Sequence, residues 1–257
     1  MNKVEESKIL GSHVSLFQPS KGYRVAIDSI FLAASVPANS GEFVLDVGAG
    51  TGASSLALAA RLPGVHIKGI EIQNQYTELA IKSAQHNKAE GWVTFVNGDI
   101  SSSEFISHAD TYDHVMTNPP FFESGHGRKS RIPEKVIANM ESNIGLAEWL
   151  NFCVRTLKTR GTITLIHRAD RLDQILAVLR GKVGELIIFP LWPGVANNNF
   201  RRSARRVLVQ GRKGIKSPTQ IKSGLVLHKE GGSYTDAAVG ILSHARALDL
   251  RADGETN

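Results

Sequence analysis

Residues 43–52 of the chain read FVLDVGAGTG, an apolar run that ends in an aspartate and three glycines at every second position. A short apolar run bounded by glycines predicts a buried strand, and the small-residue stretch at 53–62, ASSLALAARL, predicts a helix. Glycine permits the tight turn between the two and lets the backbone pass close to a ligand. The amino end of the following helix favours negative groups. The stretch therefore predicts a strand, a ligand-binding loop and a helix.

The same alternation continues along the chain. Further strands are predicted at 66–72, 93–99, 112–118, 162–167, 185–189 and 205–211, and further helices at 74–87, 133–158 and 168–179. Strands and helices that alternate at this spacing form right-handed βαβ units with parallel strands. The fold class predicted is α/β, with a Rossmann-like, doubly wound open sheet.

Composition limits the class of protein. A length of 257 residues allows one large or two small domains. A single cysteine, Cys153, excludes an intrachain disulfide and a cysteine-rich zinc cluster, and the nine histidines show no metal-ligand spacing, so no metal is expected. The first residues lack the apolar region of a signal peptide, and no apolar run approaches the roughly 20 residues of a membrane span. We expect a cytoplasmic protein without a membrane partner.

Positive charge is concentrated in one part of the chain. The whole sequence has 30 Lys and Arg against 24 Asp and Glu, a net charge of +6, yet residues 186–229 contain no acidic residue. A field of one sign attracts polyanions, of which nucleic acid is the most common, although a solvated basic surface would have the same composition. The cations of this basic portion are Arg201, Arg202, Arg205, Arg206, Arg212, Lys213, Lys216, Lys222 and Lys229.

Open α/β sheets bind ligands at the carboxyl ends of their strands, and polar residues gather at four such ends here. At the first, a dinucleotide fingerprint passes through Gly48, Gly50 and Ala53, so the loop alone allows a nicotinamide cofactor as well as S-adenosylmethionine. Asp46 favours S-adenosylmethionine, because a carboxylate suits the ammonium and the sulfonium of that cofactor. The same carboxylate would be unfavourable beside the pyrophosphate of a nicotinamide cofactor. Gly52 completes the loop.

The next two strand ends carry acidic residues. Glu71 ends the second predicted strand, 19 residues after Gly52, where a carboxylate commonly accepts hydrogen bonds from ribose hydroxyls. Asp99 ends the third and could accept from the amino group of an adenine while Ile100 packs on the ring; a helix cap is the alternative for Asp99.

The fourth strand ends in Asn118-Pro119-Pro120-Phe121. Two prolines remove two backbone donors and hold the chain extended. The Asn118 side-chain oxygen and the Pro119 carbonyl can then both accept from one planar NH2 group, while Phe121 offers a ring for a flat base to stack on. An aromatic amine is a poor nucleophile because its lone pair is delocalised. Accepting both of its N–H bonds directs that lone pair toward a methyl group.

In these motifs the chain resembles class I S-adenosylmethionine-dependent methyltransferases of the amino-group type, marked by [ND]-P-P-[FYW]. DVGAGTG, Glu71, Asp99 and NPPF follow the order of that family over about residues 40–170. QPSKGYRVAIDSIFLAASVP at 18–37 and RRVLVQGRKG at 205–214 narrow the resemblance to the subgroup that methylates N6 of an adenosine beside the anticodon of valine tRNA.

The resemblance implies a seven-stranded sheet whose last strand is antiparallel, and S-adenosylmethionine as cofactor. It places the methionine end of the cofactor at Asp46 and the three glycines, with Asn118 close by, the ribose at Glu71 and the adenine at Asp99. The target amine would be held by Asn118, Pro119 and Phe121. Residues 1–38 would form a cap or lid and residues 39–257 the methyltransferase domain, with the basic portion at 186–229.

Other residues are candidates for contacts with substrate or for a lid: Tyr23, Arg24, Arg128, Lys129, Arg131, Arg205 and Arg206. Trp149 is expected to pack in the core. The function expected is methylation of the exocyclic amino group of a nucleobase, with adenine N6 in tRNA favoured. The alternatives are methylation of guanine N2 in rRNA, of adenine N6 in DNA or of N5 of a protein glutamine, and a nicotinamide-dependent oxidoreductase that uses the glycine loop alone.

Overall fold

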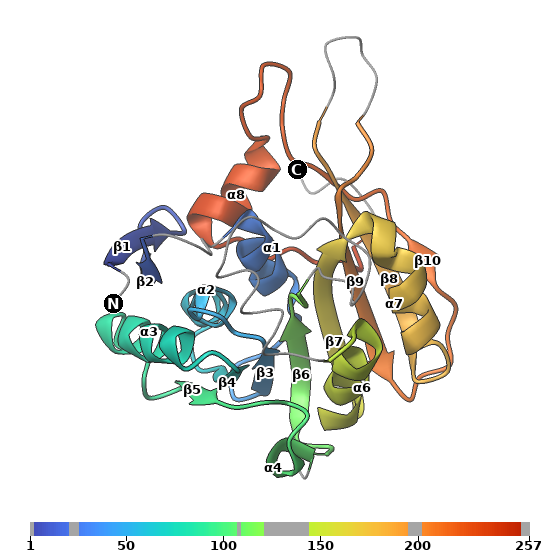
Figure 1. Ribbon diagram of the computed structural model, residues 1–257. Helices are drawn as coiled ribbons and strands as arrows, with labels where there is room; N and C mark the ends of the chain where they lie inside the picture. The colour runs from blue at the N-terminus through green and yellow to red at the C-terminus, as the bar shows by residue number, and fades with distance from the viewer. Residues whose placement is uncertain (1–2, 21–25, 107–108, 121–143, 195–201, 253–257) are drawn as a thin grey trace, which may run out of the picture.

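The computed structural model describes residues 3–20, 26–106, 109–120, 144–194 and 202–252 (Figure 1). Its strands are β1 (Val4–Ile9), β2 (Val14–Pro19), β3 (Phe43–Val47), β4 (His66–Glu71), β5 (Val93–Asn97), β6 (Tyr112–Thr117), β7 (Leu157–Arg168), β8 (Val183–Trp192), β9 (Arg206–Lys213), β10 (Gln220–Ile221) and β11 (Leu225–Val226). Its helices are α1 (Ile27–Ser35), α2 (Ala53–Arg61), α3 (Asn74–His86), α4 (Ser103–Ile106), α6 (Leu146–Thr156), the 3-10 turn η1 (Ala169–Arg171), α7 (Leu172–Leu179) and α8 (Asp236–His244).

The main sheet has the predicted doubly wound order. Its strands lie as β10-β8-β9-β7-β6-β3-β4-β5, and β11 also pairs with β8. Strand β3 pairs in parallel with β4 on one side and with β6 on the other, so the direction of winding reverses between β3 and β6. Ligands bind at such a switch point in open α/β sheets.

Seven strands form the body of this sheet, and β9 is antiparallel to both of its neighbours, β7 and β8. The α/β class and the antiparallel strand are confirmed. All seven predicted strands are present, and the two-residue strands β10 and β11 add to the outer edge, so that the described sheet has nine strands. Their pairing with β8 spans only two residues each, too short to give a periodic signal in the sequence.

Two predicted boundaries also differ. Helix α6 ends at Thr156, and β7 begins immediately at Leu157, which pairs with Tyr112 of β6; the helix was predicted to continue to residue 158. The first part of that predicted helix, 133–143, lies outside the described residues. Strand β8 extends through Pro190, which a predicted end at residue 189 had excluded. Proline is tolerated there because β10 and β11 pair with residues on either side of it and not with Pro190 itself.

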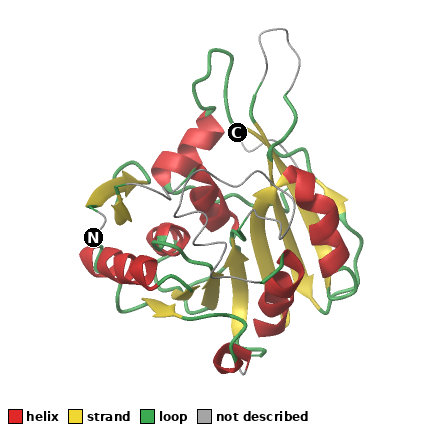
Figure 2. Cartoon of the chain, viewed as in Figure 1, coloured by secondary structure: helices red, strands yellow, loops and turns green. Residues whose placement is uncertain are grey.

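Helices cover both faces of the sheet (Figure 2). On one face α1, α2, α3 and α8 enclose a core that includes Phe31, Leu58 and Ile241. On the other face, α6 and α7 contribute Leu150 and Ile175 to a second core. The hairpin of β1 and β2 stands outside the main sheet and contacts α3. No helix in the described part of the chain is long and apolar enough to cross a membrane.

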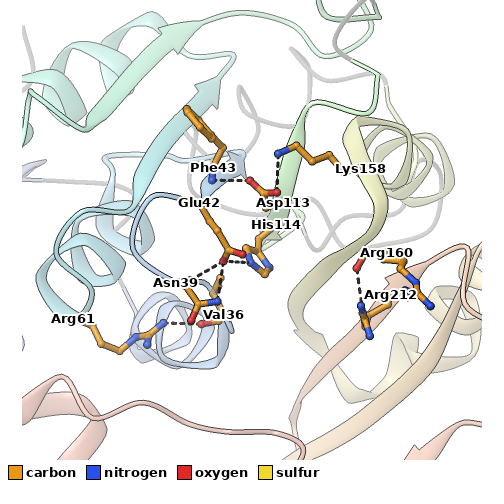
Figure 3. A network of polar contacts seen from close by, with 10 residues as sticks. All are labelled: Val36, Asn39, Glu42, Phe43, Arg61, Asp113, His114, Lys158, Arg160 and Arg212. Atoms are coloured by element: carbon orange, nitrogen blue, oxygen red, sulfur yellow. Dashed lines mark hydrogen bonds and ion pairs between the residues drawn. The ribbon is translucent and has the colours of Figure 1, made fainter.

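A polar network fixes the amino-terminal edge of the sheet (Figure 3). Asp113 accepts hydrogen bonds from the backbone of Phe43, at 3.0 Å, and from Lys158 Nζ, at 2.7 Å. Glu42 lies 2.9 Å from His114 Nε2. These contacts join β3, β6 and β7 at the edge opposite the strand ends that carry the predicted site, and so help to set the register of the central strands.

The close packing of β4 gives the first prediction. A Cβ atom at Gly69 would overlap the Phe95 ring and lie 2.8 Å from the Ala49 Cβ, whereas one at Gly91 would meet nothing within 4 Å. Gly69→Ala should therefore lower the free energy of unfolding by about 1–3 kcal/mol, the usual cost of overpacking. Denaturant unfolding measures it with Gly91→Ala as control, and equal effects of the two substitutions would contradict the packing described here.

Candidate active site

The glycine loop follows β3 and adopts a conformation that suits glycine. Gly48, Gly50 and Gly52 have φ angles of +76°, +57° and +86°. The N–H groups of Gly48 and Ala49 both donate to the Ile70 carbonyl, at 2.9 and 3.0 Å, which holds the loop against the end of β4. A Cβ at Gly48 would lie 2.8 Å from the Trp149 ring, so both the φ angle and the space require glycine.

Asp46, in β3 just before the loop, is buried, with 2% of its surface exposed. Its Oδ2 accepts a hydrogen bond from the Ser55 hydroxyl at 2.7 Å. Burial raises the pKa of Asp46 to about 7; the hydrogen bond from Ser55 opposes this shift and the charge of Glu71 adds to it. A buried carboxylate of this kind is a strong acceptor for a cationic group that enters its cavity.

Glu71, at the end of β4, holds the loop in place. Its Oε2 accepts from the backbone N–H of Gly50 and its Oε1 from that of Gln73, both at 2.9 Å, and the residue is buried. A carboxylate offers about four lone-pair positions, so hydroxyl groups of a ligand can still donate to it.

Asp99 follows β5 and is half-buried. Its Oδ1 accepts from the backbone N–H of Ser101 at 2.8 Å. This contact closes a turn before α4, which begins only at Ser103, so Asp99 does not stand at the cap position of that helix. The Oδ2 atom is not used in the turn. The neighbouring Ile100 is buried.

Two cavities meet at Gly48. The first has a polar lining and contains Asp46 and Asn118; the second is more apolar and contains Glu71, Asp99 and Ile100. The first is lined by Ser29, Asp46, Gly48, Ala49, Thr51, Ala53, Ser54 and Asn118. The second is lined by Gly48, Ile70, Glu71, Ile72, Gly98, Asp99, Ile100, Ile144 and Trp149. Gly50 and Gly52 shape the loop but line neither cavity.

Asn118 stands directly after β6 and reaches the first cavity. Its side-chain oxygen is buried, and none of the described residues donates a hydrogen bond to it. A buried acceptor without a donor costs about 1–3 kcal/mol, so such an atom marks a place where a ligand donor fits. Pro119 is buried and Pro120 is exposed, so the chain leaves the sheet at this point.

Several predicted residues cannot be placed. Tyr23, Arg24, Phe121, Arg128, Lys129 and Arg131 lie outside the described residues. Arg205 is exposed, at the same edge of the sheet as the cavities, because the start of β9 pairs with the carboxyl end of β7. Arg206, its neighbour, forms an ion pair with Asp28 of α1 at 2.7 Å.

The sequence interpretation missed the part that Trp149 plays at this site. Trp149 is buried as expected, but its ring also lines the second cavity. Its Nε1 donates to the Thr117 hydroxyl at 2.9 Å, and that hydroxyl donates to the Val47 carbonyl at 2.8 Å. Trp149 is 32 residues from Thr117, and no local pattern indicates this contact. Ser29 was missed for the same reason, although it lies within the stretch that carries the narrower resemblance.

Comparison with known proteins agrees with this geometry. A family model described as methyltransferase small domain matches residues 21–145. A tRNA1(Val) (adenine(37)-N6)-methyltransferase of Aeromonas hydrophila is 25% identical over 221 residues, which cover 86% of this chain and 89% of that protein. One of the same name from Porphyromonas gingivalis is 32% identical over 158 residues, 59% of this chain and 61% of that protein.

The fold is shared with a solved structure from Agrobacterium tumefaciens, described as a predicted O-methyltransferase, with a TM-score of 0.69 and 22% identity over 86% of this chain and 97% of that one. The chain is thus similar in sequence to methyltransferases and shares the fold of S-adenosylmethionine-dependent methyltransferases. Over most of its length it is similar to the tRNA1(Val) (adenine(37)-N6)-methyltransferases. The two cavities fit the chemistry of that cofactor. The buried carboxylate of Asp46 lines the first, where it suits a cationic group, and the apolar side chain of Ile100 lines the second, where it suits a flat ring.

The burial of Asp46 gives the second prediction. Because its folded-state pKa, about 7, is above the ordinary 3.8, the folded protein without cofactor loses stability as the pH rises from about 4 to 7. Asp46→Asn removes the buried charge and should stabilise the cofactor-free protein at pH 8, by at most about 4 kcal/mol.

The gain should shrink as the pH falls below about 7, and it should vanish only below 3.8, where Asp46 is protonated in both the folded and the unfolded state. Thermal unfolding of the two proteins at pH 8 and pH 5 measures this. A gain of the same size at both values would show that ionisation of Asp46 is not its origin.

Proposed function

We propose that the protein transfers a methyl group from S-adenosylmethionine to the exocyclic N6 of an adenine in tRNA. The observation that carries the proposal is the buried side-chain oxygen of Asn118, which lacks a donor among the described residues and lines the same cavity as Asp46. The names of the similar proteins support the substrate.

The residues at the end of β6 would prepare the amine. The Asn118 oxygen and the Pro119 carbonyl would accept hydrogen bonds from its two N–H groups. This favours a pyramidal nitrogen and makes available the lone pair that is otherwise delocalised into the ring. S-adenosylmethionine, held by Asp46, Glu71 and Asp99, would supply a sulfonium methyl group as the electrophile for this nitrogen, with the thioether as the leaving group. The methylated nitrogen then releases one proton to water, so no dedicated base is needed at the start. Phe121 would stack on the base.

The two cavities would bind the two ends of the cofactor. Asp46, with its neighbours of the glycine loop, would receive the ammonium of the methionine end, and charge pairing there would return the pKa of Asp46 toward its ordinary range. Glu71 would accept from the ribose hydroxyls. Asp99 would accept from the adenine amino group while Ile100 packs on the ring. Residues 1–38 would cap this site above the domain formed by 39–257.

The basic portion would hold the nucleic acid. Arg205 is exposed at the edge of the sheet that carries Asn118, where it can contact a phosphate without reading a base. Tyr23, Arg24, Arg128, Lys129 and Arg131 would add contacts from the segments before α1 and after β6. A target base flipped from the RNA would then reach the cavity.

The third prediction tests the part played by Asn118. Asn118→Ala should lower methyl transfer by at least about a hundredfold, the size of effect seen when one preorganised catalytic hydrogen bond is lost. It should leave the affinity for S-adenosylmethionine within about twofold, since Asp46, Glu71 and Asp99 remain. Calorimetry and a single-turnover assay separate the two quantities. Loss of cofactor affinity with an unchanged rate of the bound complex would place Asn118 in the cofactor site instead.

A direct test of the substrate offers S-adenosylmethionine with a labelled methyl group to total tRNA, ribosomal subunits, DNA and a protein extract in separate reactions. The proposal expects label in tRNA, and mass spectrometry of the digested product should identify N6-methyladenosine. Label confined to rRNA guanine, DNA adenine or protein glutamine would overturn the substrate assignment. Asn118→Ala serves as the matched control, because background label should persist in that variant.

A further inference from the structure

Helix α1 is fastened to strand β9 at both of its ends. At its carboxyl end, Gln210 Nε2 donates to the Ser35 carbonyl at 2.9 Å and to the Thr164 hydroxyl at 3.1 Å. At its amino end, Arg206 Nε donates to Asp28 Oδ2 at 2.7 Å. The two residues of β9 are four apart and therefore lie on the same face of the strand. The helix is thus held along one line of side chains.

The amino-terminal contact lies next to the cofactor site. Asp28 occupies the first turn of α1, and the following residue, Ser29, lines the cavity that contains Asp46 and Asn118. The side chain of Asp28 is 9% exposed and that of Arg206 is 33% exposed. The ion pair therefore joins a buried carboxylate beside the cavity to the start of β9, across 178 residues of sequence.

We propose that Arg206 and Asp28 form a positioning pair, which fixes the amino end of α1 against the methionine end of the cofactor site, and that Arg206 serves cofactor binding and does not contact phosphate. This inference rests on the proposed function for the assignment of that cavity. It separates Arg206 from Arg205, although both belong to the basic portion and the sequence interpretation gave them one role.

Charge supports this division of roles. If Arg206 turned outward to a phosphate, the buried carboxylate of Asp28 would lose the partner that compensates it, which is strongly unfavourable. The Arg206 Nη1 also donates to the Arg205 carbonyl, at 3.3 Å, which further fixes the guanidinium. Arg205, by contrast, is exposed, and no described residue pairs with its guanidinium. The adjacent arginines thus offer a matched pair for an experiment.

The experiment compares Arg206→Gln with Arg205→Gln. Calorimetry with S-adenosylmethionine alone should give an affinity about tenfold weaker for Arg206→Gln and an unchanged affinity for Arg205→Gln. Asp28→Asn should resemble Arg206→Gln, and the double variant should be no weaker than either single variant, because the two residues act through one contact. Arg206→Lys, which keeps a charge opposite Asp28, should recover most of the affinity.

The second readout is RNA affinity, measured with total tRNA at several salt concentrations. Arg205→Gln should reduce the steepness of the slope of log K against log salt by about 1, the contribution of one phosphate contact. Arg206→Gln should leave the slope unchanged. An unchanged cofactor affinity in a folded Arg206→Gln protein, or a reduced salt slope, would overturn the inference. Should Arg206→Gln fail to fold, Asp28→Asn and Arg206→Lys carry the cofactor test.

Neither readout involves methyl transfer. A failure to methylate tRNA would therefore count against the proposed function and leave this test intact, while equal effects of the two arginine substitutions would count against the positioning pair alone.

Discussion

The pairing of β3 with β6 is the constraint on which the site depends. Their register places Val47 opposite Thr117, and the Thr117 hydroxyl donates to the Val47 carbonyl. The next residues along the chain are Gly48 after β3 and Asn118 after β6, and both line the same cavity. Trp149 adds its indole N–H to the same hydroxyl and limits the space at Gly48. The strand pairing and the Thr117 hydroxyl thus together hold the glycine loop beside the Asn-Pro-Pro turn.

Much of this arrangement could be predicted from the sequence, because the signals are local. The strand, the glycine loop and the helix follow one another in residues 43–61, and Glu71, Asp99 and Asn118 each end a predicted strand. In this fold class the carboxyl ends of the parallel strands lie at one edge of the sheet, so these residues were expected to converge. The cavity linings at Gly48 agree with that expectation.

The rest could not be predicted, because it depends on contacts between distant residues. Nothing near Arg206 in the sequence indicates that Asp28 will accept from it, and a run of arginines has the same composition whether it faces RNA or an acidic partner. Trp149 has the sequence spacing of a core residue, and it is buried in the core. Its additional place in the lining of the second cavity therefore left no separate signal in the sequence. The short strands β10 and β11 pair over two residues each, too few for any periodicity.

The position of β9 between β7 and β8 has a consequence for synthesis on the ribosome. Strand β8 leaves the exit tunnel before β9, yet its pairing along the described sheet is with β9 and with the two short strands that follow. Until β9 has emerged, β7 and β8 both present unpaired backbone, a template for association with other nascent chains. The chain must therefore be translated through the end of β9, at Lys213, before β7 and β8 can pair with it, and α1, made before every strand of the main sheet, gains its contacts with Arg206 and Gln210 only then.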